Sequence, residues 1–176
     1  MLENLTSLML IFRIFKMNWT RKFFKKQYIL FEDNQPIGSI RRKFLASDSA
    51  CQLRDNTFNF KRVGFVKHRF TVSSEKENHI AEITFARLWT RATIKFKNGN
   101  LYHWQVNKLW GHFWSIEHQS KTQTTFIETF LCGTVLGDVS NDVLVLAGLM
   151  IKVYFKRAVI FSTLGIIVVL CLLSSI

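Results

Sequence analysis

The stretch Val-Leu-Val-Leu-Ala-Gly-Leu-Met-Ile at residues 143–151 is apolar at every position. A helix that is hydrophobic on all sides has to be buried on all sides. Ser140 and Asn141 precede it and are good N-cap residues. A helix over residues 142–155 would be about 21 Å long, which is short for crossing a bilayer but suits a rod inside a small barrel. We therefore predict a core helix over residues 142–155.

Upstream of this helix, residues 27–133 show short alternations of apolar and polar residues broken by turn residues, a pattern typical of antiparallel strands. The clearest hairpin signals are residues 33–36 and Asn98-Gly99, and the latter favours a type I′ turn. This spacing predicts about nine strands in a barrel or sandwich. The expected strands are 28–32, 37–44, 53–60, 63–72, 80–86, 91–97, 102–106, 112–118 and 124–131. With the buried helix, they predict a mainly β fold, an antiparallel β-barrel wrapped around a hydrophobic C-terminal helix.

Downstream, the last nineteen residues, 158–176, carry no charge, and twelve of them are Val, Ile, Leu or Phe. A helix of this length spans about 28 Å, close to the ~30 Å hydrocarbon core of a bilayer. Lys152, Lys156 and Arg157 precede it, and positive residues favour the cytoplasmic side. We predict a single C-terminal transmembrane helix, a tail anchor that holds the β-domain on the cytoplasmic side. The alternative is a second helix buried in the fold.

The N-terminal segment, residues 1–26, is apolar and then basic. Residues 5–15 are too short and wrongly flanked for a signal peptide. An amphipathic helix and a second start at Met17 both remain open. Trp19 and Phe23 lie among the lysines and arginines of residues 16–26, a composition that suits either a membrane interface or a solvated basic linker.

The chain is strongly basic, with 24 Lys and Arg against 12 Asp and Glu and a net charge of +12, all of it outside the last nineteen residues. Such a field attracts polyanions, which means nucleic acid or an anionic membrane surface. A hydrophobic content of 48% and a single proline exclude a disordered chain. Cys51, Cys132 and Cys171 are too few and scattered for a disulfide framework, so we expect reduced thiols.

A series of strands followed by one apolar helix resembles the tubby C-terminal-like superfamily, which includes the phospholipid scramblases and the plant LURP-one-related proteins. The matching pieces are the hairpin at residues 33–38, the strand segments at 61–72 and around Asn98-Gly99, and the helix start at Asn141-Asp142. The resemblance covers residues 27–155. It implies a closed twelve-stranded barrel around a hydrophobic helix and, in tubby-type members, a basic groove for phosphoinositide headgroups. The apolar run after the core helix departs from the family pattern and favours a membrane anchor.

Basic clusters are the strongest functional signal in the sequence. We predict lipid-headgroup contacts at seven of these residues, with a merely solvated surface as the alternative. They are Arg41, Arg42, Lys43, Lys61, Arg62, Lys67 and Arg69.

Signals for catalysis and metal binding are scarce. There is no Gly-rich phosphate loop, no Gly-x-Ser-x-Gly, no His-Glu-x-x-His and no Cys-x-x-Cys, so we predict neither an enzyme nor a cofactor. His103, His112 and His118 could meet across a barrel to hold zinc, but ordinary rim histidines are the favoured interpretation. We expect the carboxylates of Glu82, Glu117 and Glu128 to face outward as partners of Lys and Arg.

These observations predict a membrane-anchored, non-enzymatic domain that interacts with anionic phospholipid or serves as a membrane-associated scaffold for an unidentified protein partner. One alternative is a nucleic-acid-binding basic barrel, although no recognition helix is recognisable. Another is a scramblase-like lipid transporter, which would have to act as an oligomer because a single span provides no polar path for lipid.

Overall fold

The computed structural model describes residues 16–22, 27–42, 48–63, 69–86, 90–107 and 112–173, apart from the side chains of Arg42 and of residues 157–170 and 172–173. This part of the chain forms twelve strands and one long helix, α2 (Asp142–Leu173). The strands are β1 (Lys16–Lys22), β2 (Gln27–Glu32), β3 (Gln35–Arg42), β4 (Asp48–Leu53), β5 (Asn56–Val63), β6 (Arg69–Ser74), β7 (Ala81–Phe85), β8 (Arg91–Phe96), β9 (Leu101–Val106), β10 (Phe113–His118), β11 (Lys121–Glu128) and β12 (Cys132–Gly137).

The strands form a closed antiparallel barrel in which each strand pairs with its neighbour in sequence. β1 completes the ring by pairing with β12, with Met17 opposite Val135 and Trp19 opposite Gly133. Closure removes the free strand edges that would otherwise invite aggregation. The fold class predicted from the sequence, a β-barrel with a hydrophobic C-terminal helix, is confirmed at this level.

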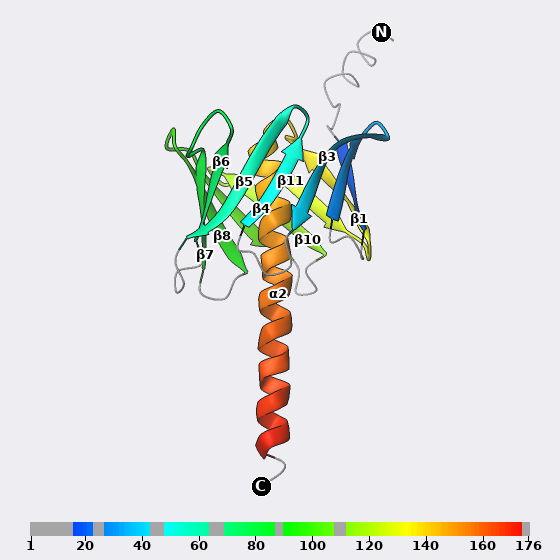
Figure 1. Ribbon diagram of the computed structural model, residues 1–176, viewed down its shortest axis with the longest axis vertical. Helices are drawn as coiled ribbons and strands as arrows, with labels where there is room; N and C mark the ends of the chain where they lie inside the picture. Colours follow the sequence, from blue (N-terminus) through cyan, green and yellow to red (C-terminus); the bar gives the residue numbers. More distant parts are fainter. Residues whose placement is uncertain are drawn as a thin grey trace.

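Helix α2 enters the barrel at one end and leaves at the other, and its last turns extend far beyond the strands (Figure 1). We name the end where α2 begins the closed end; it contains the turn at Asp33 and the loop before Asp142. We name the opposite end, where α2 leaves, the exit end; there β3 ends at Arg42 and β11 at Glu128.

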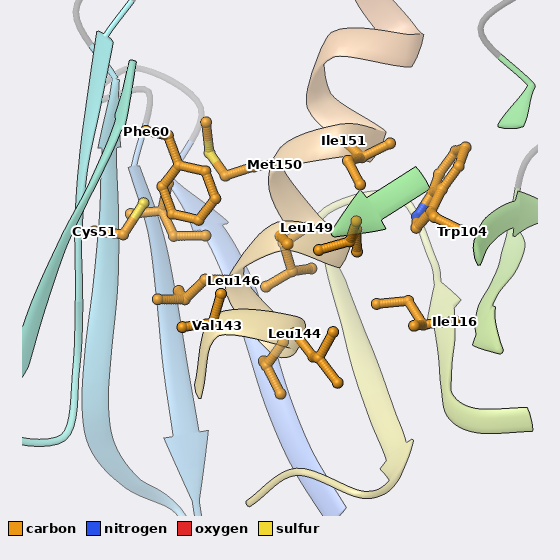
Figure 2. Packing of buried hydrophobic residues seen from close by; sticks show 14 of the residues in the cluster. Cys51, Phe60, Trp104, Ile116, Val143, Leu144, Leu146, Leu149, Met150 and Ile151 are labelled. Carbon is orange, nitrogen blue, oxygen red and sulfur yellow. The ribbon is translucent and has the colours of Figure 1, made fainter. Parts of the chain in front are cut away.

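Alternation along each strand fills the barrel with apolar side chains that face the helix. Leu144, Leu146 and Ile151 of α2 are at most 1% exposed, and residues such as Phe60 and Trp104 surround them from the wall (Figure 2). Gly148 lies against Phe126, where an added Cβ would stand 2.3 Å from the ring. The apolar run at 143–151 is thus the centre of the core, as predicted.

The helix begins where the sequence indicates and ends later than expected. Asn141 is the N-cap, since its Oδ1 accepts a hydrogen bond from the backbone N–H of Leu144 at 3.2 Å. We expected a core helix that ends at residue 155 and a separate helix from residue 158. The structure instead has one continuous helix to Leu173, because Lys152, Lys156 and Arg157 are good helix formers and nothing between them breaks the backbone.

Tight turns at the closed end use residues that tolerate positive φ. Asp33 and Asn34 both have positive φ (48° and 64°), as a two-residue hairpin requires. The hairpin at Asn98-Gly99 is also present, but the type I′ prediction was wrong. A type I′ turn needs positive φ at both residues, and of these two only Gly99 has it (90°). Gly99 N–H donates to the Phe96 carbonyl and Phe96 N–H to the Asn100 carbonyl, which makes a longer loop with glycine at the left-handed position.

The barrel also has more strands than the sequence indicated. β1 begins at Lys16, so the expected boundary at residue 27 was wrong, and the basic stretch we assigned to an N-terminal segment is partly wall. The expected strand 53–60 contains only the last residue of β4, then the turn at Arg54, whose φ is 52°, and the first five residues of β5, so most of β4 was missed. β12 was missed because Gly133 and its small neighbours give a weak alternation.

Candidate functional site

Predicted basic residues from distant parts of the sequence come together at the exit end. Arg41 and Arg42 end β3, Lys61 and Arg62 lie in the last three residues of β5, and Arg69 begins β6. These residues occupy neighbouring strands, because β3, β4, β5 and β6 are consecutive in the barrel. Neighbouring strands lie about 4.8 Å apart, so the group spans about 14 Å of the wall. The other two candidates, Lys43 and Lys67, lie outside the described residues.

The outward positions in this group are Arg41, Lys61 and Arg69. Arg69 Nε lies 3.1 Å from Glu82 Oε1. Arg41 and Lys61 are exposed, and no ion pair joins either side chain to another residue within the described ranges. Asp48 is the register partner of Lys61 on β4, so one carboxylate lies within this basic surface.

Basic residues also lie on two further strands at the exit end. Arg21 and Lys22 end β1, and Arg91 begins β8, whereas Asp48 and Glu128 are the acidic residues at this end in the part of the chain that the structure describes. Within the described ranges, the cations at this end of the wall lie on strands between β1 and β8, whereas β9 to β12 have no Lys or Arg at their exit ends. Assigning each Lys or Arg of the sequence to its nearest strand end would have predicted this arrangement, but β1 was not recognised as a strand.

Three charged side chains lie where α2 passes through the mouth of the barrel. Glu128 faces inward, and its Oε1 accepts a hydrogen bond from Lys156 Nζ at 2.6 Å while Oε2 lies 4.0 Å from Lys152 Nζ. Lys152 is 4% exposed, and its ammonium lies 4.8 Å from the Trp114 ring centroid. Burial lowers the pKa of Lys152 to about 8, although the nearby Glu128 carboxylate raises it.

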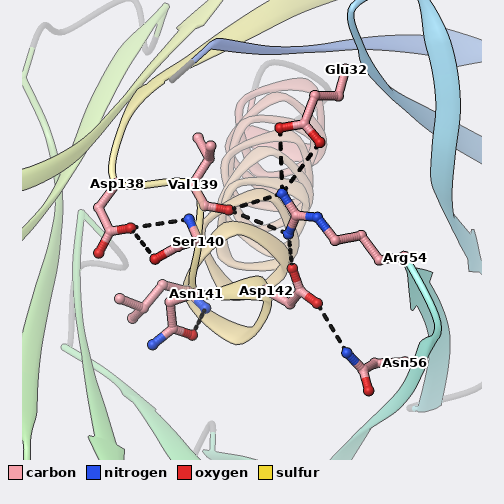
Figure 3. Close-up of polar contacts among 9 residues, drawn as sticks. Glu32, Arg54, Asn56, Asp138, Val139, Ser140, Asn141 and Asp142 are labelled. Atoms are coloured by element: carbon pink, nitrogen blue, oxygen red, sulfur yellow. Dashed lines mark hydrogen bonds and ion pairs between the residues drawn. The ribbon is translucent and has the colours of Figure 1, made fainter. Parts of the chain in front are cut away.

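The closed end contains most of the acidic residues, which include Glu32, Asp33, Asp55, Glu75, Glu77, Asp138 and Asp142. Arg54 is the centre of a network there (Figure 3). Its guanidinium donates to Asp142, lies 3.5 Å from both Glu32 carboxylate oxygens, and donates to the Val139 carbonyl at 3.4 Å. Asn56 Nδ2 also donates to Asp142 at 3.2 Å, so this network fastens the start of the helix to two hairpins.

The remaining carboxylates only partly follow the sequence expectation. Glu82 faces outward and pairs with Arg69, as expected. Glu117 accepts a hydrogen bond from the Gln105 amide at 2.6 Å. The expectation was wrong for Glu128, which faces inward because the helix brings two lysines to meet it.

The histidines are distributed over both ends of the barrel. His112 precedes β10 and His118 is its last residue, so about 20 Å of extended strand separates them. His112 Nδ1 lies 3.2 Å from the Glu128 carbonyl, and His118 Nδ1 lies 2.8 Å from the Leu101 carbonyl. Over the described ranges, no three His, Cys, Asp or Glu residues lie close enough to share a metal ion.

A hollow of about 490 Å³ lies on the wall of β7 to β10 and is lined by His103, Glu117 and Arg91, among others. The three cysteines are free thiols, and burial raises the pKa of Cys51. Burial stabilises the uncharged form of this thiol, so we assign it a packing role.

As far as the described residues extend, no helix is both long enough and apolar enough to span a bilayer. Compared with protein-family models, curated proteins and solved structures, the chain matches none of them. The arrangement of charge around α2 therefore carries the functional argument.

Proposed function

We propose that the chain is a membrane-anchored, non-enzymatic barrel that holds its exit end against anionic phospholipid, either as a lipid-binding domain or as a membrane-associated scaffold. The observation that carries the proposal is the direction of α2. The helix leaves the barrel through the basic end and continues without a linker toward the uncharged run at residues 158–176. A tail that enters a bilayer would bring the basic end to its surface.

The charge distribution along the helix axis supports this orientation. Arg41 and Lys61 are exposed at the exit end, whereas the closed end is rich in Asp and Glu. Each Lys or Arg near an anionic leaflet contributes about 1 kcal/mol. The reverse orientation would place these carboxylates, interspersed with Lys16, Lys76, Lys97 and Lys121, against the lipid phosphates and would gain less attraction. Positive residues next to a span favour the cytoplasmic face, so we propose that the barrel lies on that side.

The stretches that join strand ends at the exit end lie outside the described residues, but their sequences agree with this proposal. Each of them contains Lys or Arg together with Phe or Trp; they are residues 23–26, 43–47, 64–68, 87–89 and 108–111. Aromatic rings and cations are the residue types favoured at membrane interfaces. A closed barrel of twelve strands around a helix is the architecture that the resemblance to the tubby C-terminal-like superfamily implies.

The lipid part of the proposal is testable on a shortened chain that ends at Arg157. This chain keeps every residue that is buried in the described core, which ends at Val153, and a cooperative unfolding transition would establish that it folds. We expect it to sediment with vesicles of phosphatidylcholine and phosphatidylserine but not with phosphatidylcholine alone.

Binding should weaken as salt rises, because the screening length falls from about 10 Å at 0.1 M to about 3 Å at 1 M. A folded chain that ignores anionic vesicles would contradict the proposal. Tighter binding to duplex DNA than to anionic vesicles at the same salt would favour the nucleic-acid alternative, which the net charge of +12 alone keeps open.

A further inference from the structure

One apolar side chain at the exit end projects into solvent to an unusual degree. Phe130, in the turn between β11 and β12, is 86% exposed, whereas the next most exposed large apolar residue in the described part of the chain, Val63, is 43% exposed. Leu131 beside it is 40% exposed. An aromatic ring left in water lacks the stabilisation that its burial would supply. An apolar environment outside the barrel would therefore stabilise this turn.

Hydrogen bonds hold the turn that carries Phe130. Thr129 N–H donates to the Cys132 carbonyl at 2.8 Å, and the Thr129 hydroxyl donates to the same oxygen at 3.0 Å. Arg21 N–H on the adjacent β1 donates to the Leu131 carbonyl at 2.6 Å. The ring is therefore presented by an ordered backbone, and little conformational entropy remains to be lost when it binds.

The position of Phe130 along the axis of α2 indicates which part of the helix lies beside it. The contact of 2.6 Å between Glu128 and Lys156 places the end of β11 beside Lys156 on α2. Thr129 and Phe130 follow Glu128 in the turn beyond the end of β11, so they lie farther toward the exit than Glu128 does. Phe130 thus lies on the exit side of the contact between Glu128 and Lys156, near the start of the uncharged run at residue 158.

A second apolar position lies across the mouth. Val63 ends β5, and the β5–β6 and β11–β12 connections are six strands apart in a ring of twelve, on opposite sides of α2. Exposed apolar residues therefore lie on both sides of the helix, with Val63 among the basic residues of β5 and β6, and Phe130 next to β1, which ends at Arg21 and Lys22. This combination matches the boundary between headgroups and acyl chains, where apolar groups enter and cations meet phosphates.

We infer that the Phe130–Leu131 turn inserts into the bilayer that receives the tail. Because α2 is continuous, it fixes the height of the barrel, and insertion of the turn fixes its tilt. This inference rests on the proposed function, since it requires the tail to enter the membrane.

The test places one fluorescent label at either end of the full-length protein. The background is Cys132→Ser with Cys171→Ser; serine keeps a hydroxyl beside Thr129, whose own hydroxyl lies 2.9 Å from the Cys132 sulfur. Cys51 is 1% exposed and reacts slowly. A polarity-sensitive dye is attached at Phe130→Cys or, as the matched control, at Leu101→Cys, which replaces a 40% exposed residue at the closed end. Both proteins are reconstituted into phosphatidylcholine–phosphatidylserine vesicles and floated.

We expect the label at position 130 to be quenched by lipid-attached nitroxide and protected from aqueous iodide at least fivefold relative to position 101. Equal iodide quenching at both positions in floated protein would overturn the inference and leave the anchor intact. Failure of the full chain to float with vesicles would overturn the proposed function and, with it, this inference.

Discussion

The two ends of the barrel contain charged residues in very different surroundings. At the closed end, Arg54 is surrounded by Glu32, Asp142 and a backbone carbonyl, and the charges join the helix to the wall. At the exit end, Arg41 and Lys61 point into solvent. The sign of a charge therefore does not reveal its role, whereas its neighbours do. Charges with several partners stabilise a fold, and exposed charges of one sign attract a partner.

The largest expected effect is on stability, because both ends of the barrel depend on the buried part of α2. Leu146→Asp places an unpaired carboxylate at a position that is 0% exposed, which costs several kcal/mol and should unfold the barrel. Loss of the cooperative urea transition, followed by tryptophan fluorescence, would confirm this. The control is Leu101→Asp, at an exposed residue. A cooperatively folded Leu146→Asp protein would contradict the assignment of α2 to the core. The helix would then no longer fix how the two ends of the barrel are placed.

Charge reversal at the exit end should change lipid binding and leave stability intact. In the chain ending at Arg157, Arg41→Glu with Lys61→Glu replaces two attractive charges by repulsive ones, so we expect affinity for anionic vesicles to fall about a hundredfold or more. The matched control, Lys97→Glu with Lys121→Glu, reverses two exposed lysines at the closed end. Sedimentation with vesicles measures both variants. Equal losses in the two proteins would mean that net charge, not its placement, attracts the lipid.

At the closed end, we expect a substitution to change stability and to leave lipid binding intact. Arg54→Met leaves Glu32 and Asp142 without their guanidinium partner and should lower the free energy of unfolding by about 1–3 kcal/mol. Lipid binding should remain unchanged. Arg41→Met, as the matched exit-end variant, should stay within about 0.5 kcal/mol of the parent protein. Urea denaturation of both proteins checks this, and a larger loss for Arg41→Met would reverse our division of roles.

The last effect concerns the mouth of the barrel and depends on pH. Folding lowers the pKa of Lys152 from 10.5 to about 8, so the unfolded chain binds this proton more tightly than the folded protein. The contribution of Lys152 to stability therefore rises with pH between about 8 and 10.5 and is constant at its lowest value below that window. Lys152→Met should remove this rise. Urea midpoints at pH 7.5, 9 and 10 test it, with Lys97→Met as the exposed control; parallel pH profiles for Lys152→Met and the parent would contradict it.

Much of the fold could be predicted because its signals are local. The apolar run at 143–151 indicates a helix buried on all sides, and Asn141 marks its first turn by its capping side chain. β4 and β12 were harder to predict, because Ser49, Cys51 and Gly133 are small residues that fill narrow parts of the wall and give little alternation. β1 does alternate, with Met17 and Trp19 inside, but its lysines and arginines suggested a membrane-interface segment instead.

The candidate site was predictable in residue type but not in arrangement. Arg41, Lys61 and Arg69 are recognisable as basic clusters, but only strand order shows that they share one end of the barrel. Glu128 could not be assigned from its strand pattern, because its partners Lys152 and Lys156 come from the helix. The position of Phe130 could not be predicted from the sequence either, since only the closed ring places its turn beside the part of α2 that leaves the barrel.

The central claim is that α2 continues from the basic end of the barrel into a bilayer. Carbonate extraction of membranes from cells that express the full chain, beside the same chain ending at Arg157, tests it most directly. We predict that the full chain stays in the membrane pellet, because the proposed span over its uncharged run would cross the hydrocarbon core. The shortened chain should be released, since carbonate removes proteins held only by charge. Release of the full chain into the supernatant would contradict the account.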